Sequence, residues 1–143
     1  MSPERALYEY LTDTVAAAAA TDALAGAAVH STRYTEIAGP VLRIGEPRLD
    51  VGPRAGEWKE FNVELLLEVV CRVDNQDFNA AREAVRKMSL EVARAIQTDG
   101  SLGGRVCDCR IVKATRGWAR IKTAPFAVQV FRLVIDPFGF SGE

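Results

Sequence analysis

The chain has 143 residues, of which 48% are hydrophobic and 26% are charged, as in an ordinary globular domain with one core. A formal net charge of −1 argues against a dedicated nucleic-acid-binding protein, which carries a clear basic excess. Neither a secretory signal nor an apolar run long enough to cross a membrane is visible. We expect one soluble domain over residues 1–143, with its three cysteines reduced.

The first predicted element is a helix from Ser2 to about Ala20. Ser2 is a suitable N-cap and Pro3 suits the first helical position, and apolar residues then recur at helical spacing. Alanines dominate its second half, so this thin helix can pack closely against a sheet or a second copy of the protein. We expect Asp22 to cap one extra turn that ends at Gly26.

The segment that follows, as far as residue 58, is weakly patterned. Val41–Ile44 is a candidate strand, and glycines and prolines crowd residues 45–58. A loop of that length is usually functional or flexible. We therefore interpret 45–58 as an exposed arm or a long hairpin loop.

The strongest strand pattern runs from Lys59 to Val73. Apolar and other residues alternate without a break from Phe61 onward, and three glutamates lie on the second face, namely Glu60, Glu64 and Glu68. Period-2 alternation over this length predicts a long strand with one buried and one wetter face.

A second helix is predicted next. The polar run 74–77 turns the chain and caps this helix, and Gly100 closes it. Its apolar stripe follows helical spacing and comprises Ala81, Val85, Met88, Val92 and Ile96.

The last third of the chain contains two or three predicted strands. Residues 106–112 form one, 116–118 are predicted to turn, and 119–122 return as a short strand. The final strand, 126–135, is apolar on both faces, which is typical of a central strand, and 137–143 form a loose tail.

The predicted fold class is α+β, with a mostly antiparallel sheet, two helices packed on one face, and the extended arm. We expect the core between sheet and helices to contain Leu65, Leu67, Val69, Val85, Met88, Val92, Val130 and Leu133.

No catalytic constellation is recognisable, so we expect the protein not to be an enzyme. Cys107 and Cys109 would share one face of a strand near Cys71, and His30 is the only histidine. These residues could form a zinc site, but zinc ligands favour closely spaced pairs within loops, and cysteines in strands are more often small buried hydrophobes. The glycines at 100, 103 and 104 follow a helix, unlike those of a phosphate-binding loop. We expect no metal and no cofactor.

Charge is unevenly distributed along the chain. Between Arg105 and Arg132 seven residues are basic and only Asp108 is acidic, whereas the rest has an acidic excess. This segment is either a solvated hairpin or a basic patch for an acidic partner or for non-specific contact with passing DNA. Tryptophan is enriched at interfaces, although both tryptophans could fold back on the sheet. The candidate assembly residues are Arg48, Arg54, Trp58, Lys113, Arg116, Trp118, Arg120 and Lys122.

The order and spacing of these elements resemble the tail-terminator, or tail-completion, proteins of long-tailed bacteriophages and phage-like particles. The resemblance covers about residues 3–136. It rests on the alanine-rich first helix ending at 22–26, the alternating strand 61–73, the run 74–77 with Ala80 and Ala81 opening the second helix, and the closing strand 126–135. The segment 27–58 departs most, because it is longer and less strand-like.

The resemblance implies a subunit of a closed ring, usually of six copies, that caps the finished tail tube and joins it to the head connector. It implies a homo-oligomer whose partners are the tail tube protein and the head–tail connector protein. Its place would be the tail or neck of a virion, after assembly in the host cytoplasm. That family has no catalytic residues. The alternatives are a head-completion or neck adaptor protein and a small ligand-binding α+β domain.

Overall fold

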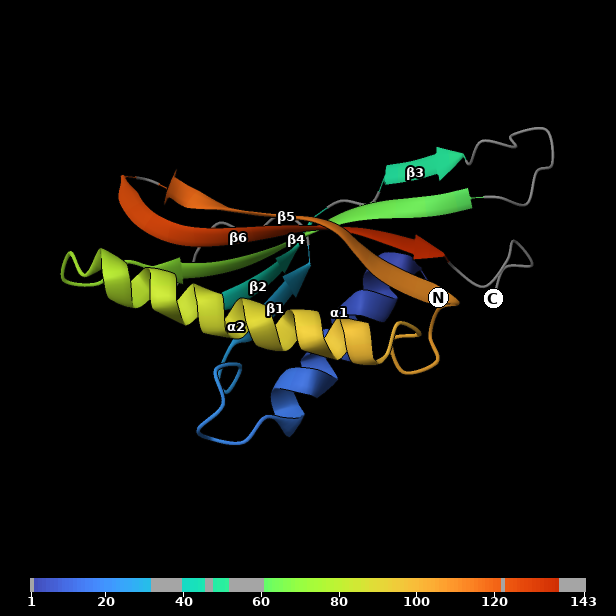
Figure 1. Ribbon diagram of the computed structural model, residues 1–143, viewed down its shortest axis with the longest axis horizontal. Coiled ribbons are helices and arrows are strands. Elements are labelled where there is room, and N and C mark those ends of the chain that lie inside the picture. The colour runs from blue at the N-terminus through green and yellow to red at the C-terminus, as the bar shows by residue number, and fades with distance from the viewer. Residues whose placement is uncertain (1, 32–39, 46–47, 52–60, 122, 137–143) are drawn as a thin grey trace.

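The computed structural model describes residues 2–31, 40–45, 48–51, 61–121 and 123–136. Within them, two helices lie on one face of a six-stranded sheet, which confirms the predicted α+β class (Figure 1). The strand order is β1-β2-β4-β6-β5, β3 also pairs with β4, and only the β1–β2 pair is parallel. The elements are α1 Pro3–Ala17, β1 Ala28–Ser31, β2 Val41–Ile44, β3 Arg48–Val51, β4 Phe61–Arg72, α2 Phe78–Thr98, β5 Asp108–Ile121 and β6 Ala124–Asp136.

Helix α1 begins at the predicted cap, where the Ser2 hydroxyl accepts a hydrogen bond from the backbone N–H of Arg5 at 3.2 Å. It ends at Ala17, earlier than expected, because Ala18 adopts an extended backbone conformation. The hydroxyl of Tyr10 donates to the carbonyl of Ala95 at 3.0 Å, which fixes α1 against α2.

Strand β4 carries the predicted alternation. Leu65 and Leu67 are fully buried on the face that the helices cover, whereas Leu66 between them is 43% exposed on the other face. Helix α2 covers this face with the predicted stripe, and all five of its members are buried: Ala81, Val85, Met88, Val92 and Ile96.

Strand β6 is central, as expected, since it pairs with β4 on one side and β5 on the other. The prediction for one core residue was wrong, because Val130 is only half-buried. It pairs with Glu68 and so lies on the face away from the helices, while Leu133, which pairs with Leu65, is fully buried among them. The other seven predicted core residues are buried.

Strand β5 corrects the predicted turn at 116–118. The strand is continuous from Asp108 to Ile121, and the chain reverses before Ala124, with Thr123 at a φ of 70°. Gly117 lies opposite Val128 in a ladder whose register is regular from Lys113 to Ile121, so pairing with β6 outweighs the local turn tendency of glycine.

The predicted arm 45–58 contains the short strand β3, which pairs with β4, Arg48 lying opposite Glu64. Residues 48–51 are therefore part of the sheet rather than of a loop. The remainder of the arm, except residue 45, lies outside the described residues, and so does the predicted tail 137–143.

Candidate functional site: a groove between α2 and the β5–β6 hairpin

Strand β5 forms one edge of the sheet, because β6 is its only strand neighbour among the described residues. Its 14 residues present a long row of backbone N–H and C=O groups that lack a strand partner in this part of the chain. Exposed edges of this length are natural templates for association, and basic side chains along them select which partner can approach.

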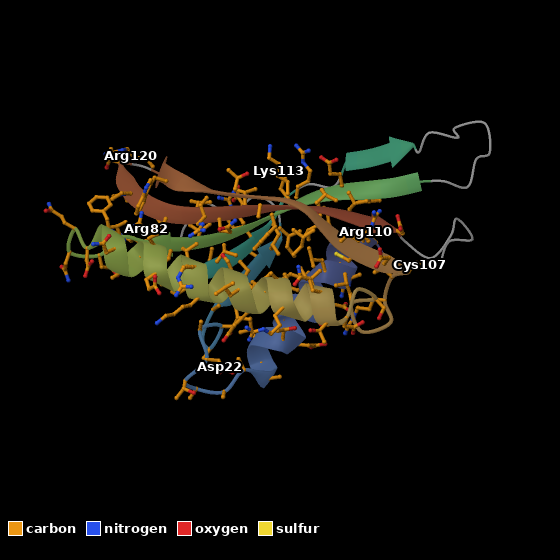
Figure 2. The ribbon with its side chains drawn as sticks, viewed as in Figure 1. Asp22, Arg82, Cys107, Arg110, Lys113 and Arg120 are labelled. Atoms are coloured by element: carbon orange, nitrogen blue, oxygen red, sulfur yellow. The ribbon has the colours of Figure 1, made fainter. Side chains whose placement is uncertain are left out.

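A β-bulge divides the basic residues of β5 between the two faces of the sheet. The pairing register shifts between Ile111 and Lys113, so every later side chain points to the opposite face from the one that simple alternation would give it. Lys113 therefore lies opposite Arg132, away from α2 (Figure 2). Three later residues lie on the α2 side instead, namely Arg116, Trp118 and Arg120.

Between α2 and this face of the hairpin lies a groove with a volume of about 240 Å³. We call it the α2 groove, and its lining residues are Arg86, Ser89, Leu90, Ala93, Ala114, Arg116, Gln129 and Phe131. A second hollow of about 320 Å³ shares Arg116 with it and is also lined by Arg82, Gly117, Trp118 and Val128. Arg116 thus belongs to both hollows.

From the sequence, Trp118 could either pack against the fold or remain accessible to a partner, and in the structure it does both. Its ring packs edge-to-face on Phe78 at the start of α2, with the ring centroids 5.5 Å apart and the planes at 72°. The two residues nevertheless remain 50% and 46% exposed. Paired aromatic rings of this kind are partly ordered before binding and still offer apolar surface to a partner.

The guanidinium groups beside this aromatic pair carry uncompensated charge. Arg82, Arg116 and Arg120 form no ion pair within the described residues. Arg86 is engaged by Glu83, whose carboxylate lies 3.1 Å from its Nε, and these hydrogen bonds lower the pKa of Glu83. The surface next to Trp118 therefore favours a negatively charged partner.

The glutamates on the opposite face of the sheet are already paired within the chain. Glu64 lies 3.5 Å from Arg132, and Glu68 lies 3.4 Å from Arg43. Glu60 lies outside the described residues. The acidic sheet face that the sequence suggested as a complementary surface is therefore partly neutralised where the structure describes it.

The predicted assembly residues have four different outcomes. Arg116, Trp118 and Arg120 come together on the α2 side, and Lys113 lies on the other face. For Arg48 only the backbone pairing is described, and three residues lie outside the described ranges, namely Arg54, Trp58 and Lys122.

Sequence reasoning did not single out the α2 side of the groove. Arg82, Arg86 and Leu90 recur at a spacing of four on α2, which places them on one helix face beside the buried stripe. An exposed leucine within an otherwise polar face was the available signal, since Leu90 is 51% exposed.

The cysteines do not form the arrangement considered from the sequence. Strand β5 begins only at Asp108, so Cys107 lies before it and is exposed, whereas Cys109 within it is buried and Cys71 on β4 is half-buried. In the part of the chain that the structure describes, no three His, Cys, Asp or Glu side chains gather in a way that could hold a metal ion.

We expect the three thiols to differ in reactivity. Burial raises the pKa of Cys109 to about 12 and raises that of Cys71 as well, which suppresses the reactive thiolate. Maleimide at neutral pH should therefore label Cys107 first, Cys71 more slowly, and Cys109 only after unfolding, as measured by peptide mass spectrometry. Rapid labelling of a Cys107→Ser variant would contradict this order.

The same burial predicts a loss of stability at alkaline pH. The Cys109 thiol has a pKa of about 12 in the folded chain against a reference of 9.0, so ionisation favours the unfolded chain once the pH exceeds about 9. The contribution is complete below that pH and falls by about 1.4 kcal/mol per pH unit up to about 12. We expect the free energy of unfolding of the Cys109→Ala variant, measured by chemical denaturation, to fall less steeply with rising pH than that of the unmodified chain.

Helices long and apolar enough to cross a membrane do not occur among the described residues. In comparisons with known proteins, no protein-family profile matches the sequence, and no curated protein is significantly similar to it.

Proposed function

We propose that the chain is a non-enzymatic, ring-forming tail terminator of a virion, which caps the tail tube and joins it to the head connector. The observation that carries the proposal is the surface at the outer half of β5. There the half-exposed ring of Trp118 stands between Arg116 and Arg120, on an edge strand, with no acidic side chain paired to either arginine in the described residues.

Such a surface suits a heterologous contact, in which one face of a subunit meets a different face of its neighbour. Tryptophan and arginine are the residue types that dominate binding energy at interfaces. Unpaired arginines add selectivity, because they attract an acidic partner and repel a basic one. The resemblance to tail terminators rests on the order of a first helix, a long strand, a second helix and a closing strand. The elements α1, β4, α2 and β6 occur in that order, which supports the assignment.

The mass of the protein in solution tests this proposal. Light scattering coupled to gel filtration should give six times 15.6 kDa for a hexameric ring. A mass of 15.6 kDa at all concentrations, with and without tail tubes, would contradict it and favour the small ligand-binding domain. A ring that binds head connectors but ignores tail tubes would identify a head-completion or neck adaptor protein instead.

A further inference from the structure

We propose that the α2 groove binds a peptide segment of a partner protein that presents an apolar side chain next to a carboxylate. The groove is complete within one copy of the chain, so this inference does not rest on ring formation. Three properties of its lining carry the proposal: apolar side chains, a buried hydroxyl without a partner among the described residues, and an arginine without an ion pair.

The apolar part of the groove sets the size of the occupant. Phe131, which is buried, adds apolar surface to its lining, and Ala93 and Ala114 leave space because their side chains are small. Its volume of about 240 Å³ is below the roughly 300–1,000 Å³ of sites for drug-sized ligands. A side chain fits this space better than a whole small molecule, and Leu90 at its border adds exposed apolar surface.

The polar part of the groove contains a hydroxyl group for which the described residues supply no hydrogen-bond partner. Ser89 is only 6% exposed, and its hydroxyl has no hydrogen-bond partner among the described residues. Gln129, equally buried, lines the same groove from β6. Buried polar groups are normally satisfied, so a ligand oxygen or N–H that reaches Ser89 would remove an energetic cost.

The charge at the rim selects a carboxylate. Arg116 lines the groove from β5 and has no ion-pair partner within the described residues, so its guanidinium is the one that can take up a carboxylate. Arg86 lines the groove from α2 but is engaged by Glu83. Guanidinium groups bind carboxylates through paired hydrogen bonds. The open sheet face of a second copy does not offer this carboxylate, because Glu64 and Glu68 on that face are engaged by their own arginines.

The proposal is tested by titrating the isotope-labelled full chain, followed by NMR, with a capped six-residue peptide in which phenylalanine and leucine alternate with glutamate. We expect the largest shifts at the backbone amides of Ser89, Ala93 and Ala114. A peptide with glutamine in place of glutamate, and one with alanine in place of the apolar residues, should each bind at least tenfold more weakly.

Variants of the chain locate the contact. Arg116→Gln should weaken binding at least tenfold, whereas Lys113→Gln, the same charge change on the other face of the same strand, should change it less than twofold. Ser89→Ala should weaken binding about fivefold without lowering the melting temperature, because the hydroxyl has no partner in the free chain.

Three results would overturn the proposal. Equal binding to the Arg116→Gln and Lys113→Gln variants would show general charge attraction, and the absence of shifts at Ser89 would show that the groove is not a site. Shifts there that depend on protein concentration alone would assign the groove to a second copy. Solution mass is measured on the same samples. A monomer that binds the peptide contradicts only the ring, and a peptide that shifts the amide signals of neither the ring nor the dissociated subunit contradicts only the groove.

Discussion

Replacing Leu67 with alanine should lower the free energy of unfolding by about 2–5 kcal/mol, the range for removing a core leucine. Leu67 is fully buried on β4, where it pairs with Phe131 on the face that α2 covers. Neighbouring backbone is held on both sides by β2 and β6, so the structure cannot collapse fully into the space left behind. Urea denaturation followed by circular dichroism measures the loss.

The adjacent residue is a matched control. Leu66→Ala removes the same atoms from a side chain that is 43% exposed on the opposite face. We expect a loss of at most about 1 kcal/mol, because little apolar surface returns to water and no enclosed cavity forms. Similar losses for both variants would contradict the assignment of the two faces of β4.

Reversing the charges of Arg116 and Arg120 together, by substitution with glutamate, should leave the fold intact and weaken the ring or its attachment to the tail. Both side chains are exposed on the α2 side of β5, and neither forms an ion pair in the described residues, so the folded subunit loses little. An acidic partner would instead face like charges, which cost several kcal/mol and weaken binding more than tenfold. Phage with this change should make tails of uncontrolled length, or tails that fail to join heads.

The control for this variant changes the same number of charges on the other face of the same strand. Lys113→Glu with Arg110→Glu alters residues that lie opposite Arg132 and Val134, on the face away from α2. Arg110 also lies 3.1 Å from Asp108, so this control loses an ion pair within the subunit that the other variant keeps. Rings should persist in this control, and circular dichroism should show both double variants folded. Normal rings and infectious particles from the Arg116 and Arg120 variant would show that this surface is merely solvated.

Much of the fold could be predicted because two segments carry strong periodicity. The predicted core residues of β4 and α2, which their periodicity assigns to the apolar face, are buried in the packed structure. The turn at 116–118 was predicted wrongly because the glycine at 117 is a local signal, whereas the strand around it is held by pairing with β6. Val130 was assigned to the core because β6 is apolar on both faces, which leaves alternation unable to choose between them.

The candidate site was only half predictable for a related reason. The excess of basic residues indicated the strand that borders the candidate groove, yet the bulge at Val112 decides which of these residues face α2, because one shifted residue inverts every later side chain. The groove also needs Ser89 and Gln129, which are far apart in the sequence and meet only when α2 packs on β6.

Ring formation on tail tubes is the central claim, and electron microscopy of the purified protein, alone and mixed with tail tubes, tests it most directly. We expect closed rings with a central opening in the free protein, and one ring at a single end of each tube in the mixture. Particles without rings, together with tubes whose ends stay bare at saturating protein, would contradict the proposed function.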